Sequence, residues 1–268
     1  MKNATVTMIT VLLALILPQF ALSQDLESGE EIVTLNTRPE VTVRILVSPP
    51  SGDAKGIFIF FSGNTGLLLS GDRVRYHSWI SGLAKRGFAV LTPDLPSDQA
   101  EDGFSDEFRV SKAHTEDIKR VIEFARQKWP KPIFLVSHSL GTLSAAHLAA
   151  VLKGDHISGV VLTGSRQQER ETRIYLSDLP LDDITYPVLF VHHRDDWCHD
   201  IEDVREQSKR LTKSPRVDFV EVVGGDYYGS EPRCRANTPH SFTGQRKELI
   251  NVIADWASGK PVPKQIGQ

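Results

Sequence analysis

The sequence predicts an α/β fold, in which a doubly wound, mostly parallel sheet has antiparallel strands at its N-terminal end and helices on both faces. Two observations support this prediction. From residue 56 onward, short apolar runs alternate with segments of helical periodicity, and most of the links are short. Before residue 56, two strand-like runs follow each other directly. Alternation of strand and helix is typical of a parallel sheet that is covered by helices.

Composition and charge limit the class of protein. The chain has 268 residues, of which 40% are hydrophobic and 24% charged, as is ordinary for one globular domain. A net charge of −3 argues against a dedicated nucleic-acid binder. The sequence contains no internal repeat, low-complexity segment or clear interdomain linker. We therefore expect a single domain over residues 24–268.

Residues 1–23 have the three parts of a secretory signal peptide. Met1-Lys2 gives a positive start, Ile9 to Leu17 is apolar, and Ala21-Leu22-Ser23 offers small residues for cleavage. The apolar run is too short for a comfortable membrane span, although an uncleaved N-terminal anchor is the alternative. We expect a mature chain that begins near Gln24, has no membrane span and is periplasmic or secreted.

The chain has two cysteines, Cys198 and Cys234. In an oxidising compartment an isolated pair is most simply a disulfide, and two free buried thiols are the alternative. Closing a loop of this length would stabilise the fold by about 4 kcal/mol on the chain-entropy estimate.

Each predicted strand and helix has a local signal. Val41, Val43, Ile45 and Val47 alternate as on a half-buried strand, and Gly56–Phe61 is a continuous apolar run typical of an interior strand. We expect strands at residues 31–35, 41–47, 56–61, 88–91, 133–136, 157–162, 187–191 and 217–223. We expect helices at residues 73–86, 113–128, 201–211 and 245–256, and one from the SHSLG turn to residue 152.

The stretch around Ser139 has the strand–turn–helix context of a nucleophile elbow. The apolar run from Ile133 to Val136 leads into SHSLG, and a helix rich in small residues follows. The usual pattern is G-x-S-x-G. Here Ser137 takes the first glycine position and Gly141 keeps the second. A plain helix N-cap is the alternative interpretation of Ser139.

Reactive or polar groups follow four of the predicted strands. They are the loop of residues 62–66, Ser139, the pair Asp195-Asp196, and His240. In an open parallel sheet, catalytic groups gather at the carboxyl ends of the strands. A nucleophile, an acid and a histidine follow one another in this order, in the segments SHSLG, PVLFVHHRDD and PHSF. This is the chain order of the α/β-hydrolase triad, and the sequence resembles the α/β-hydrolase superfamily over nearly all of its mature length.

The resemblance implies an α/β-hydrolase fold with Ser139 as nucleophile, His240 as base and Asp196 as acid. A serine hydroxyl needs a neighbouring imidazole to accept its proton, and the imidazole needs a carboxylate to fix its tautomer. His193 stands where the family has a glycine before the acid, so Asp195 is an alternative acid. His138 is expected to pack beside the turn.

The resemblance also implies two backbone donors for an oxyanion. One is Leu140, the residue after the nucleophile. The other comes from the loop after residues 56–61, with Asn64 expected and Thr65 as the alternative. A disulfide between Cys198 and Cys234 would join the acid loop to the histidine loop and fix the geometry of Asp196 and His240.

These features predict an exported serine hydrolase, most simply a carboxylic-ester hydrolase that acts on a small-molecule acyl substrate through an acyl-enzyme. Peptidase, thioesterase and acyltransferase chemistry use the same triad, and a non-catalytic binding protein on this scaffold is the alternative of another class. No cofactor is required, and we expect no metal site, because adjacent His192 and His193 point to opposite faces of a strand. The oligomeric state is not indicated.

The segment between residues 162 and 187 is too short for a large cap domain, so we expect a minimal cap. It contains Arg166, Arg170 and Arg173, which would favour an acidic substrate or would simply form a solvated charged helix.

Overall fold

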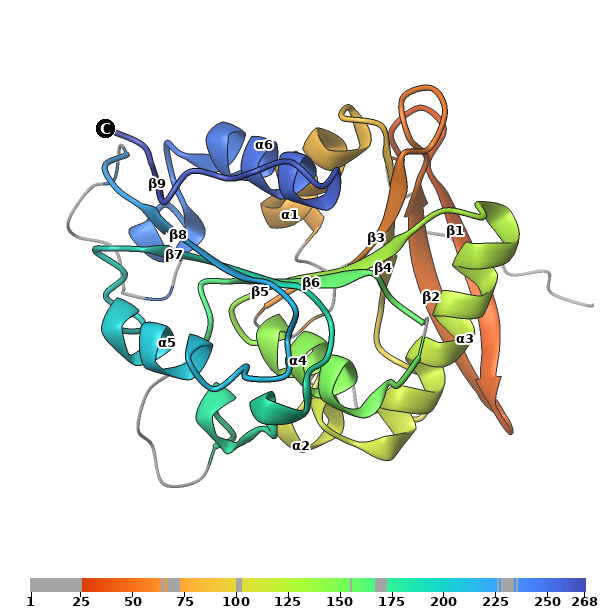
Figure 1. The fold of residues 1–268 in the computed structure, drawn as a ribbon. Helices are drawn as coiled ribbons and strands as arrows, with labels where there is room; N and C mark the ends of the chain where they lie inside the picture. Colours follow the sequence, from red (N-terminus) through yellow and green to blue (C-terminus); the bar gives the residue numbers. More distant parts are fainter. Residues whose placement is uncertain are drawn as a thin grey trace, which may run out of the picture.

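The computed structural model describes residues 26–63, 66, 73–99, 103–154, 156–166, 173–225, 227, 234 and 236–268. One sheet lies between two layers of helices (Figure 1). The predicted signal peptide, residues 1–23, lies outside the described residues. No helix among the described residues is both long and apolar enough to cross a membrane.

The sheet has nine described strands in the order β1-β2-β4-β3-β5-β6-β7-β8-β9. β2 pairs antiparallel with β1 and β4, and the remaining neighbours are parallel. The strands are β1 Glu31–Arg38, β2 Val41–Ser48, β3 Gly56–Phe61, β4 Phe88–Pro93, β5 Ile133–His138, β6 Gly159–Thr163, β7 Val188–His193, β8 Val217–Val222 and β9 Gln265–Ile266. The predicted fold class is confirmed.

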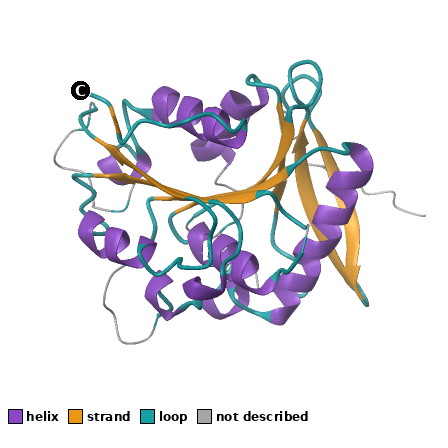
Figure 2. Cartoon of the chain, viewed as in Figure 1, coloured by secondary structure: helices purple, strands orange, loops and turns teal. Residues whose placement is uncertain are grey.

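Helices cover both faces of the sheet (Figure 2). α1 and α6 lie together on the first face, and α2, α3, α4 and α5 lie on the second. The helices are α1 Arg73–Ala84, α2 Asp106–Arg109, α3 Lys112–Lys128, α4 Gly141–Val151, α5 Ile201–Ser208 and α6 Arg246–Ala257. Short 3-10 helices are η2 Leu176–Asp178, η3 Leu181–Asp183 and η4 Pro239–Ser241.

The continuous apolar run of β3 is explained by these two layers. Phe58 and Phe60 pack into the core beneath α1 and α6, whereas Ile57, Ile59 and Phe61 pack into the core beneath α3 and α4. Successive side chains on a strand point to opposite faces, so a strand covered on both sides needs apolar residues at every position. The six residues of β3 are all buried.

The strand order reverses at β3, and this reversal places the site. The chain passes from β3 to β4 on one side, and after α3 it returns to β5 on the other side. Helices that leave such neighbouring strands diverge to opposite faces, which opens a crevice at the carboxyl ends of the strands. The ends of β3 and β5 are the 62–66 loop and the turn at Ser139.

Most predicted elements exist, with ends that differ by a few residues. The helix predicted to end at Leu211 ends at Ser208, and the strand predicted from Ile157 begins at Gly159. α2 was not predicted, because Ser105 caps a four-residue helix too short to give a periodic pattern. The two-residue β9 was also missed, since its pairing with β8 depends on tertiary contacts.

The link between β6 and β7 forms no large cap in its described part. Leu176, Leu179, Leu181 and Ile184 are buried in the core on the α4 side of the sheet. Residues 167–172, which include Arg170, lie outside the described residues. The described part of this link therefore packs its apolar side chains into the core beside α4.

A buried histidine in α3 gives the stability of this fold a dependence on pH. His114 is 2% exposed and lies among the rings of Phe61, Phe104 and Phe108. Neither ring nitrogen has a hydrogen-bond partner among the described residues. Burial, reinforced by the charge of Arg109, lowers the pKa of the His114 imidazole to about 3.

We expect His114→Phe to lose less unfolding free energy than the parent when the pH is lowered to mildly acidic values. An unfolded histidine binds a proton below a pH of about 6.5, whereas folded His114 stays neutral, so the free energy of unfolding falls as the pH falls through this range. The variant lacks this contribution. Its loss of unfolding free energy between about pH 6.5 and about pH 5.5 should be about 1 kcal/mol smaller than that of the parent. Urea unfolding at both pH values measures this, and equal losses in the two proteins would contradict it.

Candidate active site

The turn between β5 and α4 holds Ser139 in a left-handed backbone conformation, with a φ of 53°. Such a conformation is uncommon for a residue with a side chain and is found where the surroundings impose it. A Cβ on Gly141 would lie 2.2 Å from the carbonyl oxygen of Phe61, so only glycine lets α4 begin this close to β3. Leu140, not Ser139, is the N-cap of α4, which makes the N-cap interpretation of Ser139 wrong.

Ser137 stands at the first glycine position of this turn, and its contacts show why a serine fits there. The side chain is fully buried, and its hydroxyl donates a hydrogen bond of 2.9 Å to the Val161 carbonyl on β6. A serine is small enough for the position, and this bond satisfies its one donor. The departure from the usual glycine is therefore accommodated by the neighbouring strand.

Three predicted residues from distant parts of the chain meet at the carboxyl edge of the sheet. Nε2 of His240 lies 2.9 Å from Oγ of Ser139, and Nδ1 of His240 lies 2.8 Å from Oδ2 of Asp196. His240 is carried by η4 and Asp196 by the loop after β7. Since a carboxylate only accepts, the Nδ1–H of His240 donates to Asp196 and Nε2 is left to accept from Ser139.

Asp196 is buried and surrounded by donors. Its Oδ1 accepts the backbone N–H of Cys198 at 2.8 Å and that of His199 at 3.4 Å. Burial acts to raise the pKa of this carboxyl, but the charge and hydrogen bond of His240, with smaller effects of His192 and His199, outweigh it and hold the pKa below its usual range. The carboxylate therefore stays ionised inside the protein.

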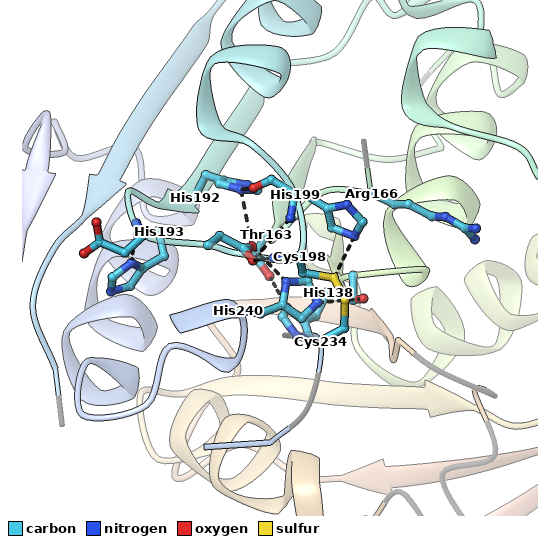
Figure 3. A network of polar contacts seen from close by, with 12 residues as sticks. His138, Thr163, Arg166, His192, His193, Cys198, His199, Cys234 and His240 are labelled. Atoms are coloured by element: carbon cyan, nitrogen blue, oxygen red, sulfur yellow. Dashed lines mark hydrogen bonds and ion pairs between the residues drawn. A yellow bond between two sulfur atoms is a disulfide. The ribbon is translucent and has the colours of Figure 1, made fainter. Parts of the chain in front are cut away.

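A fully buried histidine on β7 supports the same carboxylate. Nε2 of His192 donates to the His199 carbonyl at 2.9 Å and lies 3.3 Å from Oδ2 of Asp196 (Figure 3). Burial lowers the pKa of His192, so the ring is neutral. The sequence interpretation missed this role, although the position of His192 in PVLFVHHRDD, four residues before the acid, was a usable signal.

Asp195, the alternative acid, does not reach His240. Its backbone N–H donates to Nδ1 of His193 at 3.0 Å, and Nε2 of His193 donates to the Gly224 carbonyl at 2.8 Å. The His193 ring therefore links the turn before Asp196 to the chain after β8. Its hydrogen bonds account for a histidine where the resemblance gives a glycine.

His138 lies beside the turn, as predicted. Its ring packs between Trp79 and the His240 ring, with centroids 5.3 and 5.0 Å away. Nδ1 of His138 donates to the Thr163 hydroxyl at 3.3 Å, because that hydroxyl itself donates to the Ser137 carbonyl. The ring forms one wall against which the His240 imidazole is held.

The structure places one of the two predicted oxyanion donors. The Leu140 N–H lies at the start of α4, and no described residue accepts a hydrogen bond from it. Asn64 and Thr65 lie outside the described residues. The preceding Gly63 is close to the nucleophile, since a Cβ on it would lie 2.7 Å from Cβ of Ser139, but its N–H already donates to the Tyr76 hydroxyl.

The predicted disulfide is present. Cys198 and Cys234 are bonded, and they join the loop that carries Asp196 to the chain that leads to His240 (Figure 3). Cys198 is buried whereas Cys234 is exposed. The bond thus spans from the solvent to the centre of the site.

Of the arginines considered for an acidic substrate, Arg166 has a partner within the chain. Arg166 forms an ion pair of 2.9 Å with Asp106 in α2, and its guanidinium lies over the Tyr175 ring. Arg170 lies outside the described residues. The positive charge of Arg166 is already matched by Asp106, so this arginine does not favour an acidic substrate.

Comparisons with known proteins agree with this architecture. A family model described as the alpha/beta hydrolase fold matches residues 56–178. The comparison with curated proteins found no match to this chain. Three solved structures illustrate the similarity in fold, each at low sequence identity.

The esterase domain of a Rhodothermus marinus protein aligns with a TM-score of 0.59 and 16% identity, covering 86% of this chain and 98% of that one. A serine hydrolase without a lid from Xanthomonas campestris has a TM-score of 0.59 and 13% identity, with coverage of 89% and 98%. A soluble variant of monoglyceride lipase from Saccharomyces cerevisiae has a TM-score of 0.64 and 13% identity, with coverage of 87% and 96%. By its strand order, its match to the family model over residues 56–178 and these structures, the chain has the alpha/beta hydrolase fold.

Proposed function

We propose that this protein is an exported serine hydrolase that cleaves carboxylic esters through Ser139, His240 and Asp196. The observation that carries the proposal is the continuous line of contacts from the Ser139 hydroxyl through both nitrogens of His240 to a buried carboxylate, at 2.9 and 2.8 Å. Nucleophile, base and orienting acid in hydrogen-bond reach of one another are the geometric signature of nucleophilic acyl transfer.

The reaction follows from where each proton lies. Ser139 attacks the acyl carbon while its proton passes to Nε2 of His240, and the leaving alcohol then takes that proton as the acyl-enzyme forms. A water molecule gives its proton to the same nitrogen and attacks the acyl group. The acid is then released as the Ser139 oxygen takes that proton back from His240. Asp196 remains ionised throughout and stabilises the imidazolium that forms in each step.

The negative oxygen of the tetrahedral intermediate needs fixed donors. We assign one to the Leu140 N–H, which is uncommitted among the described residues and lies at the start of α4, where backbone donors and the helix dipole favour an anion. We assign the other to the loop after β3, at Asn64 or Thr65. This loop reaches the nucleophile, because Gly63 is in close contact with Ser139.

Ester substrates are favoured by two observations. The described part of the β6–β7 link is committed to the core, which leaves no large cap over the site. Solved structures of similar fold are named as an esterase domain, a lidless serine hydrolase and a monoglyceride lipase. A small-molecule acyl ester is the substrate class that fits both, and thioesters and peptides use the same triad chemistry.

Export rests on the N-terminal segment and the cysteines. Residues 1–23 have the composition of a signal peptide, and a disulfide in the structure agrees with an oxidising compartment. We therefore infer that the active enzyme is periplasmic or secreted.

A fluorophosphonate probe tests the nucleophile. The parent protein should be labelled covalently, and Ser139→Ala should lose all labelling, because only an activated serine attacks the probe. Ser137→Ala is the matched control: it removes a hydroxyl two residues away, costs about 1 kcal/mol for the lost hydrogen bond to Val161, and should keep its labelling. No labelling of the folded parent would favour a non-catalytic binding protein.

The two neighbouring acids give a second test. Asp196→Asn removes the acceptor that fixes the His240 tautomer, so kcat for an aryl ester should fall by about 10³- to 10⁴-fold with little change in KM. Asp195→Asn keeps the backbone hydrogen bond to His193 and should stay within about twofold of the parent. Equal losses in the two variants would show that the acid is wrongly assigned.

The disulfide should stabilise both the fold and the geometry of the site. The double variant Cys198→Ser/Cys234→Ser should lose up to about 4 kcal/mol of unfolding free energy, because its unfolded chain is no longer constrained. We expect kcat to fall as well, since the loop that positions Asp196 is no longer tied to the loop of His240. Chemical unfolding and ester hydrolysis by the folded variant measure the two effects, and a variant equal to the parent in both would refute this role.

A further inference from the structure

One cysteine of the disulfide lies in a group of potential metal ligands at the site. One ligand atom each from Cys198, His199 and His240 lies within 4.8 Å of the other two. All three residues are buried, at 3%, 8% and 2% exposure. We propose that Cys198, His199 and His240 form a binding site for a soft divalent cation such as Zn²⁺ when the Cys198–Cys234 bond is reduced, and that occupation of this site blocks hydrolysis.

The distances suit tetrahedral coordination. Sγ of Cys198 lies 3.2 Å from Nε2 of His199, close to the roughly 3.5 Å that separates a sulfur and a nitrogen on one tetrahedral Zn²⁺. All three ligand atoms lie within 4.8 Å of one another, so no pair has to approach by more than roughly 1.3 Å to reach that spacing. Reduction frees the Cys198 side chain to rotate, which lets its sulfur adjust to the two imidazoles. One thiolate and two imidazoles form a donor set that Zn²⁺ prefers.

Asp196 holds the ligands in place beforehand. Its Oδ1 accepts the backbone N–H groups of Cys198 and His199, and its Oδ2 accepts Nδ1–H of His240. A histidine that binds a metal through one nitrogen usually donates its other N–H to such a carboxylate. The partner that a metal-bound His240 would need is therefore already in contact with it.

The same arrangement makes metal binding compete with catalysis. Nδ1 of His240 is occupied by Asp196, which leaves Nε2, 2.9 Å from the Ser139 hydroxyl, as the nitrogen for a metal. A metal on Nε2 takes the lone pair that accepts the serine proton. The loss of activity thus rests on the proposed function, whereas the metal site itself does not.

The disulfide controls access to the site. A disulfide sulfur carries no charge to offer a cation, so the oxidised protein lacks its thiolate ligand. Cys234 is exposed, which allows a thiolate of a reducing thiol to attack its sulfur. The S–S bond breaks, Cys198 leaves as a thiolate, and a second thiol displaces the first from Cys234, so that the two reductant thiols are oxidised to a disulfide as both cysteines are reduced.

Cys234→Ser tests the site without any reductant, because it leaves Cys198 as a free thiol. Addition of Co²⁺ should produce the near-ultraviolet absorption of a thiolate bound to cobalt. The Zn²⁺ concentration that halves ester hydrolysis by Cys234→Ser should be roughly tenfold or more below the concentration that halves hydrolysis by Cys198→Ser/Cys234→Ser. Each rate is compared with the rate of the same variant without metal. Cys234→Ser/His199→Gln should lose most of this sensitivity. The parent protein reduced with a phosphine should be inhibited by Zn²⁺, whereas the oxidised parent should not be. This comparison tests the site even if Cys234→Ser does not fold.

Equal Zn²⁺ sensitivity in the single and double cysteine variants, or no cobalt–thiolate absorption in folded Cys234→Ser, would overturn the metal site and leave the proposed hydrolase intact. Absorption from cobalt together with undiminished hydrolysis would support the site and overturn the catalytic role of His240.

Discussion

The geometry of the site depends on one buried carboxylate. One oxygen of Asp196 accepts a hydrogen bond from the His240 ring, and the other accepts hydrogen bonds from two backbone N–H groups. The neutral His192 ring lies beside the carboxylate. A buried charge is costly unless hydrogen bonds compensate it, so these contacts are needed for the fold as well as for the chemistry. Since the loop folds around the carboxylate, the acid and the residues that follow it, Cys198 and His199, are positioned together.

The rest of the structure brings a serine to this acid and histidine. The reversal of strand order at β3 opens the carboxyl edge, and Gly141 lets α4 start against the end of β3. Ser139 is thereby held with a φ of 53° and with its hydroxyl towards His240. The His138 ring and the Trp79 ring beside it limit the movement of the imidazole. In the proposed reaction, groups held this closely would need little reorganisation in the transition state.

The parts of this arrangement that follow local rules were predictable from the sequence. The apolar run at Gly56–Phe61 required a strand buried on both faces, and SHSLG between a strand and a helix indicated the turn. The choice of Asp196 over Asp195 needed coordinates, because adjacent residues in a loop can point anywhere. The role of Ser137 was also beyond the sequence, since it depends on the Val161 carbonyl brought close only by folding. The sequence position of His192 pointed to the acid, but its bond to the His199 carbonyl needed coordinates.

The proposed function depends on an acyl-enzyme that Ser139 forms with the help of His240 and Asp196. The most direct measurement mixes the protein with a slowly hydrolysed nitrophenyl ester and follows both nitrophenol release and the mass of the protein. We expect a burst of about one equivalent of nitrophenol, with the added acyl mass mapped to the peptide that contains Ser139. Hydrolysis without an acylated protein, or with the acyl group on a different residue, would contradict the account.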